Sequence, residues 1–248
     1  MNQPNEPVNP TSASIPPLPT PPSLPPDAGL GVILDTLLKR PAALIHGLCD
    51  PRPSRAWLVL ALVAVPAFAL YGLHIGSVAG GAQLGVAAVK VSAGALLSAL
   101  ICFPSLYIFA CLTGADVSLR GLAGVLFAML TLTGVLLLGF APVAWVFSQS
   151  TESVAFIGTL HLVFWLIATS FGLRLLGHLT KALRVADRAH LKVWTVIFVL
   201  VCLQMTTALR PIIGTSDHWL PVEKKFFLAH WAESLTSEAL PANARGSN

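Results

Sequence analysis

Residues 121–147 read GLAGVLFAMLTLTGVLLLGFAPVAWVF, and this stretch decides the fold class. It lies within 31 consecutive residues between Arg120 and Glu152 that carry no charge. A helix needs about 20 apolar residues to cross the hydrocarbon core of a bilayer. A helix also satisfies its backbone hydrogen bonds internally, which an open sheet in lipid cannot do. The stretch therefore predicts a transmembrane helix.

Four other uncharged runs, 17 to 34 residues long, are separated from it and from each other by short segments that contain charged residues. We expect further spans at 56–77, 91–113, 154–176 and 192–210. The first run is too long for one span, and its glycine-rich end is expected to turn out of the membrane before Lys90. Overall the chain is 55% hydrophobic and 10% charged, whereas soluble domains carry about 25% charged residues. The predicted fold is an all-α integral membrane bundle of about five helices over residues 56–210.

Two N-terminal segments precede the bundle. Residues 1–28 hold ten of the nineteen prolines and predict a disordered tail with polyproline-II character. This tail is either a PxxP docking segment for a partner or, as we favour, a solvated tether. Residues 29–55 predict two short amphipathic helices split by Pro41, which are too short to span. We expect them at the interface, with Lys39 and Arg40 near anionic lipid.

The distribution of basic residues predicts the orientation. With the N-terminus in the cytoplasm, ten Lys and Arg fall in cytoplasmic segments and five on the opposite side, as the positive-inside rule requires. Lys90 is discordant and is expected to snorkel to the outer headgroups. An odd number of spans places residues 211–248, a short polar tail with interfacial aromatic residues, outside.

Several functions are disfavoured by composition. The net charge of +4 is spread along the chain without a basic cluster, so we expect no nucleic-acid partner. The four cysteines form no CxxC pair and are expected to be small buried hydrophobes rather than disulfides or zinc ligands. No HExxH, GxSxG or P-loop motif occurs, and no predicted span carries an acidic residue. The sequence therefore predicts no enzyme, cofactor or metal.

Residues inside the predicted spans are the remaining functional candidates. Pro104 and Pro142 predict kinks that serve either as hinges or as packed bends. Gln204, together with Thr206 and Thr207, is expected to bond between helices. The candidate residues are Pro104, Tyr107, Arg120, Pro142, Gln204, Arg210, Pro211 and Gly214.

The last three of these candidates close the final span. Arg210 faces the negative end of the helix dipole, and a proline followed by a glycine ends the helix. A docking role for Arg210 stays open.

Two histidines enter the predicted bundle from the same side. His74 lies near the outer end of the first span, and His161 lies about two turns inside the fourth. Their placement makes a bis-histidine haem or a proton relay geometrically feasible. The alternative is that each simply forms a hydrogen bond inside the protein.

Short motifs at fixed places carry a family resemblance over about 70–215. They are FPSLYIF at 103–109, LTG at 112–114, SLR at 118–120, APV at 141–143, LQM at 203–205 and LRPIIG at 209–214. In this pattern the chain resembles a family of uncharacterised bacterial inner-membrane proteins. The resemblance implies a multi-pass protein of the bacterial cytoplasmic membrane. A weaker likeness to the five-span Yip family rests on the Lys39-Arg40-Pro41 lead-in and the span number, although the Tyr-Gly-Pro element of that family is missing.

Together these features favour a non-catalytic membrane scaffold or accessory subunit. Its expected partners are the lipid bilayer, a cytosolic protein bound through residues 1–55 and the basic 174–192 segment, and a second copy of the chain, since small residues at helix surfaces favour close packing. The alternative is a component of a small-molecule or lipid transporter with a path around Pro104 and Pro142. A cavity lined by Ser98, Ser105, Thr131 and Thr133 would favour the transporter, and a closed apolar core the scaffold.

Overall fold

The computed structural model describes residues 25, 28–50, 55–77, 81, 83–114, 117–151, 153–183 and 189–208. Within these ranges the chain forms seven α-helices and no strand. Five of the helices are long and apolar enough to cross a membrane. The predicted all-α membrane bundle is therefore confirmed, while the predicted disordered tail at 1–28 lies, apart from residues 25 and 28, outside the described residues.

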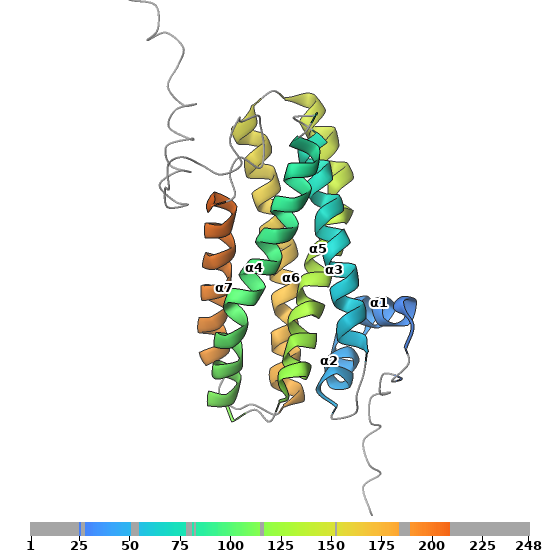
Figure 1. Cartoon of the computed structure of the whole chain (residues 1–248), viewed down its shortest axis with the longest axis vertical. Helices are drawn as coiled ribbons and strands as arrows, with labels where there is room; N and C mark the ends of the chain where they lie inside the picture. The colour runs from blue at the N-terminus through green and yellow to red at the C-terminus, as the bar shows by residue number, and fades with distance from the viewer. Residues whose placement is uncertain are drawn as a thin grey trace, which may run out of the picture.

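The five long helices are arranged side by side (Figure 1). They are α3 (Ala56–Ser77), α4 (Gln83–Leu112), α5 (Leu119–Ser150), α6 (Val154–Ala182) and α7 (Ala189–Ala208). The prediction for the first span matches α3. Helix α4 begins eight residues earlier than predicted, because the turn at Gly81, with φ of 57°, ends before Gln83 and places Lys90 inside the helix.

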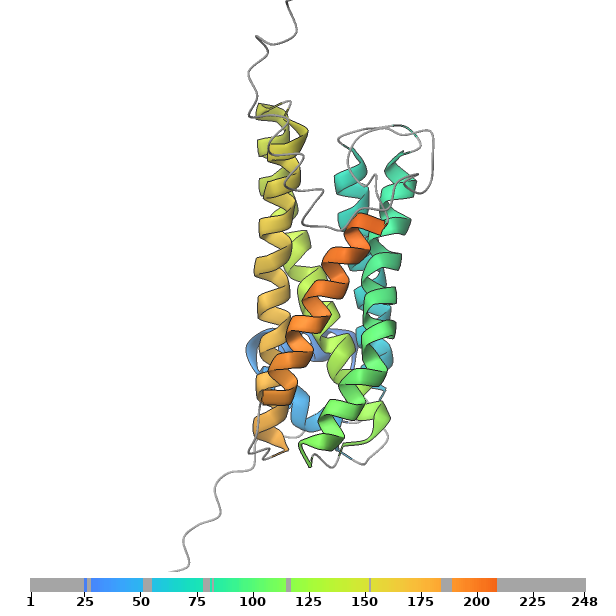
Figure 2. The ribbon, with the colours of Figure 1, turned by 90° about the vertical axis from the view of Figure 1, so that its left-hand side faces the viewer.

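The helices do not pack in chain order. Helix α3 packs against both α4 and α5, α5 packs against α6, and α7 packs against α4. The spatial order is therefore α7, α4, α3, α5, α6, and Figure 2 shows α7 crossing obliquely in front of the bundle. Helix α5 contacts more helices than any other, since α1, α2 and α4 contact it in addition to α3 and α6.

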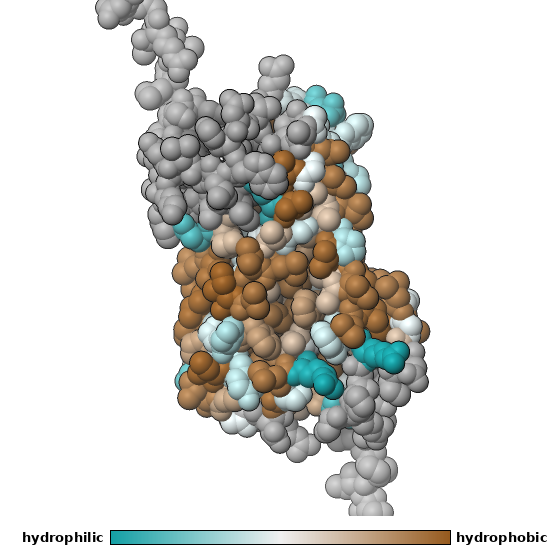
Figure 3. All heavy atoms as spheres, viewed as in Figure 1, coloured by the Kyte–Doolittle hydropathy of each residue, from teal (hydrophilic) through white to brown (hydrophobic). Residues whose placement is uncertain are grey.

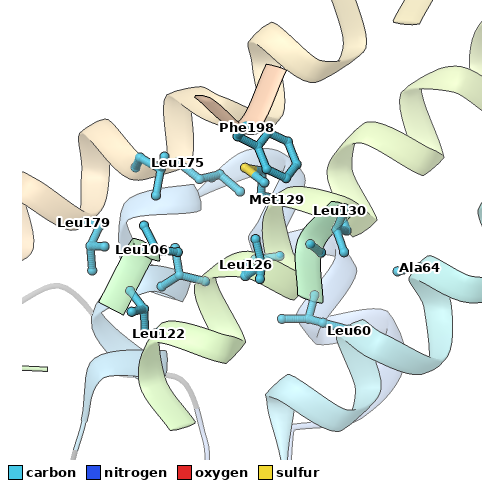
Figure 4. Close-up of a cluster of buried hydrophobic side chains, with 14 of the residues drawn as sticks. Leu60, Ala64, Leu106, Leu122, Leu126, Met129, Leu130, Leu175, Leu179 and Phe198 are labelled. Atoms are coloured by element: carbon cyan, nitrogen blue, oxygen red, sulfur yellow. The ribbon is translucent and has the colours of Figure 1, made fainter. Parts of the chain in front are cut away.

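The centre of the bundle is filled by aliphatic side chains from all five long helices (Figure 4). Leu60, Leu106 and Leu122 are fully buried there, and Met129 is 1% exposed. Because the lipid tails are as apolar as leucine, this core is held by close van der Waals packing more than by the hydrophobic effect. The apolar face of α5 is correspondingly the most enclosed, with 72% of its 18-residue apolar window buried.

Two glycines allow helices to touch backbone to backbone. A Cβ at Gly72 on α3 would lie 2.6 Å from the Ala88 Cα on α4. A Cβ at Gly172 on α6 would lie 2.5 Å from the Thr133 hydroxyl and 2.9 Å from the Met129 carbonyl on α5. Small residues at such crossings are typical of membrane helix pairs.

The short helices α1 (Leu30–Lys39) and α2 (Pro41–Cys49) lie against one end of the bundle, with α1 running across its long axis (Figure 1). Their apolar residues Ile33, Leu37, Leu44 and Ile45 are at most 1% exposed. The expectation that these faces rest in the lipid headgroups is therefore not what the structure shows, because α2 packs on α5 and α6. The opposite face of α1 does carry exposed apolar residues, Leu30, Val32 and Leu38.

The outer surface is apolar over the middle of the long helices (Figure 3). Exposed large hydrophobic side chains occur on every one of them, for example Leu62 on α3, Leu100 on α4 and Leu200 on α7. A contiguous apolar surface of this size fits a lipid environment. The described part of the chain thus has the surface of a multi-pass membrane protein.

Candidate functional site

The prolines inside the long helices face outward. Pro104 and Pro142, and Pro66 on α3, are all exposed on the surface of their helices. A ring pointing away from the bundle does not line an interior path. Pro104 instead lies beside a helix contact, because the Cys102 carbonyl accepts hydrogen bonds from the Trp194 indole at 3.0 Å and from the Ser105 hydroxyl at 2.8 Å.

Tyr107 and Arg120 lie at the end of the bundle where α1 and α2 are found, which we call the α1–α2 end. Tyr107 is half-buried in the last turns of α4, and Arg120 is exposed in the first turn of α5. The Ser118 hydroxyl caps α5 by accepting the Gly121 N–H at 3.1 Å. The exposed position of Arg120 leaves its charge at the surface, beside this cap.

The polar residues near the end of α7 are only partly placed. The Gln204 Oε1 atom is buried without a hydrogen-bond partner among the described residues. Thr206 donates to the Leu203 carbonyl of its own helix at 2.6 Å, so its expected bond to another helix is not formed. The side chain of Thr207 and the candidates Arg210, Pro211 and Gly214 lie outside the described residues.

The hydroxyl groups that would line a polar path are bonded to backbone carbonyls. Ser98 donates to the Gly94 carbonyl at 2.7 Å, and Thr133 donates to the Met129 carbonyl at 2.9 Å. Thr131 donates to the Phe127 carbonyl on its own helix and to the Leu60 carbonyl on α3, both at 2.8 Å. The Ser105 hydroxyl also donates to a backbone carbonyl, so all four hydroxyls expected to line a transport cavity form hydrogen bonds within a helix or between helices.

The two histidines expected in the same half of the bundle do meet. The rings of His74 on α3 and His161 on α6 have centroids 6.0 Å apart. Tyr71, one turn before His74, joins them: its hydroxyl is 2.8 Å from the His161 Nδ1 atom in a buried hydrogen bond. Tyr71 is 3% exposed and His161 is 7% exposed. We call these three residues the histidine–tyrosine cluster.

The cluster occupies the end of the bundle opposite α1 and α2. His74 is three residues before the last residue of α3, and His161 is the eighth residue of α6. The His74 Nε2 atom is buried and has no hydrogen-bond partner among the described residues. Buried polar atoms without partners are rare in folded proteins and call for an explanation. Tyr71 was not a sequence candidate, because a single tyrosine in an apolar run gives no signal until the pairing of helices is known.

The described cysteines lie apart from the histidine–tyrosine cluster and differ in their burial. Cys102 and Cys202 are buried as expected, whereas Cys111 is exposed, which corrects the expectation for that residue. Cys49, at the end of α2, is half-buried, and burial raises the pKa of its thiol to about 11. Among the described residues no group of three or more His, Cys, Asp or Glu side chains is placed to hold a metal ion.

Lys90 is the buried basic residue of α4. It is 4% exposed and lies in the first third of α4. Its long side chain is therefore enclosed by the protein.

No protein-family model, curated protein sequence or solved structure matches the chain. A function for the protein therefore has to be inferred from the arrangement of its own helices and side chains.

Proposed function

We propose that this protein is a non-catalytic scaffold or accessory subunit of a membrane complex. It resides in the bacterial cytoplasmic membrane with its N-terminus in the cytoplasm, and it recruits a cytosolic protein through residues 1–55 and the basic 174–192 segment. The observation that carries the proposal is the closed centre of the bundle. Leu60, Leu106, Leu122 and Met129 fill it, and the hydroxyls that would have lined a path donate to backbone carbonyls instead.

The same observation counts against the transporter alternative. A path around Pro104 and Pro142 needs these prolines to face the interior, but both are exposed on the outer surface. Polar groups along such a path would also need to be available to a solute.

The charges support the orientation. Seven of the eight described Lys and Arg residues lie toward the α1–α2 end, and Lys90 is the exception. The seven are Lys39, Arg40, Arg55, Arg120, Arg174, Lys181 and Lys192. Excess Lys and Arg on one side marks the cytoplasmic face. Asp35 pairs with Lys39 at 2.5 Å and offsets little of this charge.

The recruitment is tested by isolating the protein from native membranes in mild detergent. Three chains are compared: the full chain, one lacking residues 1–28, and a full-length variant in which Pro16, Pro17, Pro19, Pro21 and Pro22 are replaced by alanine. Proteins that accompany the full chain and are lost from both variants support docking through the proline-rich segment. Loss from the deletion alone assigns the segment a tether role. A protein without partners in all three preparations contradicts the scaffold and leads to flux assays in liposomes.

The orientation is tested separately in a Cys111→Ser background. A membrane-impermeant maleimide applied from outside should label Thr151→Cys, at the end of α5, and should not label Lys181→Cys, near the end of α6. After the membrane is permeabilised, both should react. The reverse pattern would place the N-terminus outside.

A further inference from the structure

We propose that His74 and His161 hold a single transition-metal ion, with Tyr71 as the residue that positions His161. The site is independent of the scaffold function proposed above. It would take a borderline cation such as Cu²⁺ or Zn²⁺, because imidazole nitrogens suit these ions better than they suit Mg²⁺ or Ca²⁺.

The spacing of the rings fits a shared ion. Metal–nitrogen bonds to histidine are about 2.0–2.1 Å long, which places the ion about 3 Å from the centre of each ring. Two imidazoles bound to one ion therefore have centroids about 5 Å apart at a tetrahedral angle and about 6 Å apart when they lie on opposite sides of the ion. The observed separation of His74 and His161 is 6.0 Å, with the ring planes inclined by 60°.

The hydrogen bond of Tyr71 prepares His161 for this role. The bond engages Nδ1, at 2.8 Å, and leaves Nε2 as the nitrogen of His161 that can bind a metal. When the Nδ1–H donates to the phenol oxygen, Nε2 carries the lone pair that a metal requires. Histidine ligands in metal sites commonly donate their second N–H in this way, which fixes both the tautomer and the ring orientation. Tyr71 is held in turn by its burial on α3.

The second ligand explains an otherwise unsatisfied atom. His74 Nε2 is buried and lacks a partner among the described residues, although leaving a buried polar atom unpaired destabilises a protein. Coordination to an ion would supply that partner. His74 lies on α3 and His161 on α6, and both of these helices pack against α5, so the ion would also link α3 directly to α6.

Two protein ligands leave coordination positions for water or an added ligand. The position near the ends of α3 and α6 keeps the charge of the ion out of the middle of the membrane, where an unpaired charge is costly. Neutral imidazole is the form that binds, so acidification should release the ion.

The experiment uses the full chain, purified without a histidine tag, freed of metal with a chelator and embedded in lipid nanodiscs. Titration with Zn²⁺ by calorimetry should give one site per chain. Cu²⁺ should give an electron paramagnetic resonance spectrum with hyperfine coupling to nitrogen. The one-to-one binding should be lost in His74→Gln and in His161→Gln, because glutamine keeps a hydrogen-bonding side chain but is a poor ligand.

Tyr71→Phe distinguishes a positioning role from a structural one. It should weaken Zn²⁺ binding by about 10–100-fold while the thermal unfolding of the metal-free protein keeps its cooperativity and the Cu²⁺ spectrum, at saturation, still shows nitrogen coupling. The matched control is His46→Gln with His178→Gln, which removes two histidines outside the cluster and should leave the affinity unchanged. Stoichiometric binding that survives in the His74 and His161 variants, or the absence of saturable binding in the full chain, would overturn the proposal.

Discussion

Helices α5 and α7 are both long and apolar enough to cross the membrane, but they are held in different ways. In α5, 72% of the apolar window is buried, and in α7 only 22% is buried. Helix α5 contacts its neighbours through closely packed aliphatic side chains and is approached by the glycine-bearing face of α6. Helix α7 packs on α4 and is fixed there by the fully buried Trp194, whose indole bonds to the Cys102 carbonyl.

The difference shows that similar hydropathy can encode two structural roles. Lipid and protein are equally apolar surroundings for a leucine, so hydropathy does not separate the central helix from the peripheral one. The packing of side chains separates them, because α5 contacts other helices on most sides, whereas α7 depends on one large side chain at one interface. Stability should therefore be spread over many residues in α5 and concentrated at Trp194 in α7.

The largest effect should come from a cavity in α5. Leu122→Ala removes a fully buried side chain and should lower the free energy of unfolding by about 2–5 kcal/mol. The measurement is reversible unfolding in mixed micelles, followed by circular dichroism. The matched variant Leu200→Ala, on α7, removes a side chain that is 50% exposed and should change stability by less than about 0.5 kcal/mol. Equal losses would show that α5 is no more central than α7.

A smaller loss is expected where α6 approaches α5. Gly172→Ala places a Cβ within 2.9 Å of the Met129 carbonyl, and such overpacking costs about 1–3 kcal/mol. Gly177→Ala, on the same helix, has open space around its Cβ and should be neutral or should stabilise by about 0.5–1 kcal/mol. A neutral Gly172→Ala would mean that the α5–α6 contact is looser than this close approach indicates.

The indole bond of α7 should contribute less. Trp194→Phe keeps an aromatic ring beside Phe198, with which Trp194 is stacked at 5.1 Å, but it removes the donor to Cys102. The expected loss is about 1 kcal/mol, measured by the same unfolding transition in mixed micelles. A pair of cysteines that crosslinks α7 to α4 should restore the stability if the loss reflects weaker docking of α7. No effect of Trp194→Phe would assign the docking to packing alone.

The effect that is smallest at neutral pH concerns the contact of α2 with α5. Burial raises the pKa of the Cys49 thiol to about 11 from its ordinary value of 9.0. The folded state thus keeps its thiol proton above the pH at which the unfolded state loses it, so stability should fall as the pH rises from about 9 to about 11. Cys49→Ala should remove this part of the pH dependence, whereas Cys111→Ala should leave it intact. Identical pH profiles for the native chain and Cys49→Ala would indicate that α2 leaves the thiol in solvent.

The number of spans and most of their positions are predictable from the sequence because isolated charges separate the apolar runs. The start of α4 is predicted too late, since a lysine normally marks the boundary of an apolar run although Lys90 is buried within the helix. The short helices α1 and α2 are predicted at the lipid interface because an amphipathic pattern is the same whether the apolar face meets lipid or protein. The packing of α2 on α5 and α6 shows that its apolar face contacts protein rather than lipid.

The candidate site is less predictable than the fold. The sequence places His74 and His161 in the same half of the bundle, since their depths follow from the span positions. Their contact and the bond from Tyr71 depend on which helices face each other, and small residues alone do not determine that order. Gly72 and Gly172, which bring helices closest, are likewise not distinguished in the sequence from the many other glycines, and Gly85 and Gly139 prove to face open space.

The packing of α2 on α5 and α6 constrains the order in which the protein is assembled. Helix α2 leaves the ribosome before any span, but the surfaces that receive it belong to α5 and α6, about 70 to 140 residues later in the chain. The apolar side chains of Leu44, Ile45 and Leu48 therefore cannot form their native contacts until α6 has been translated. Until then, lipid or a chaperone must shield them from water. The first helices to be synthesised are among the last to reach their native contacts, so their docking reports that most of the bundle has been inserted.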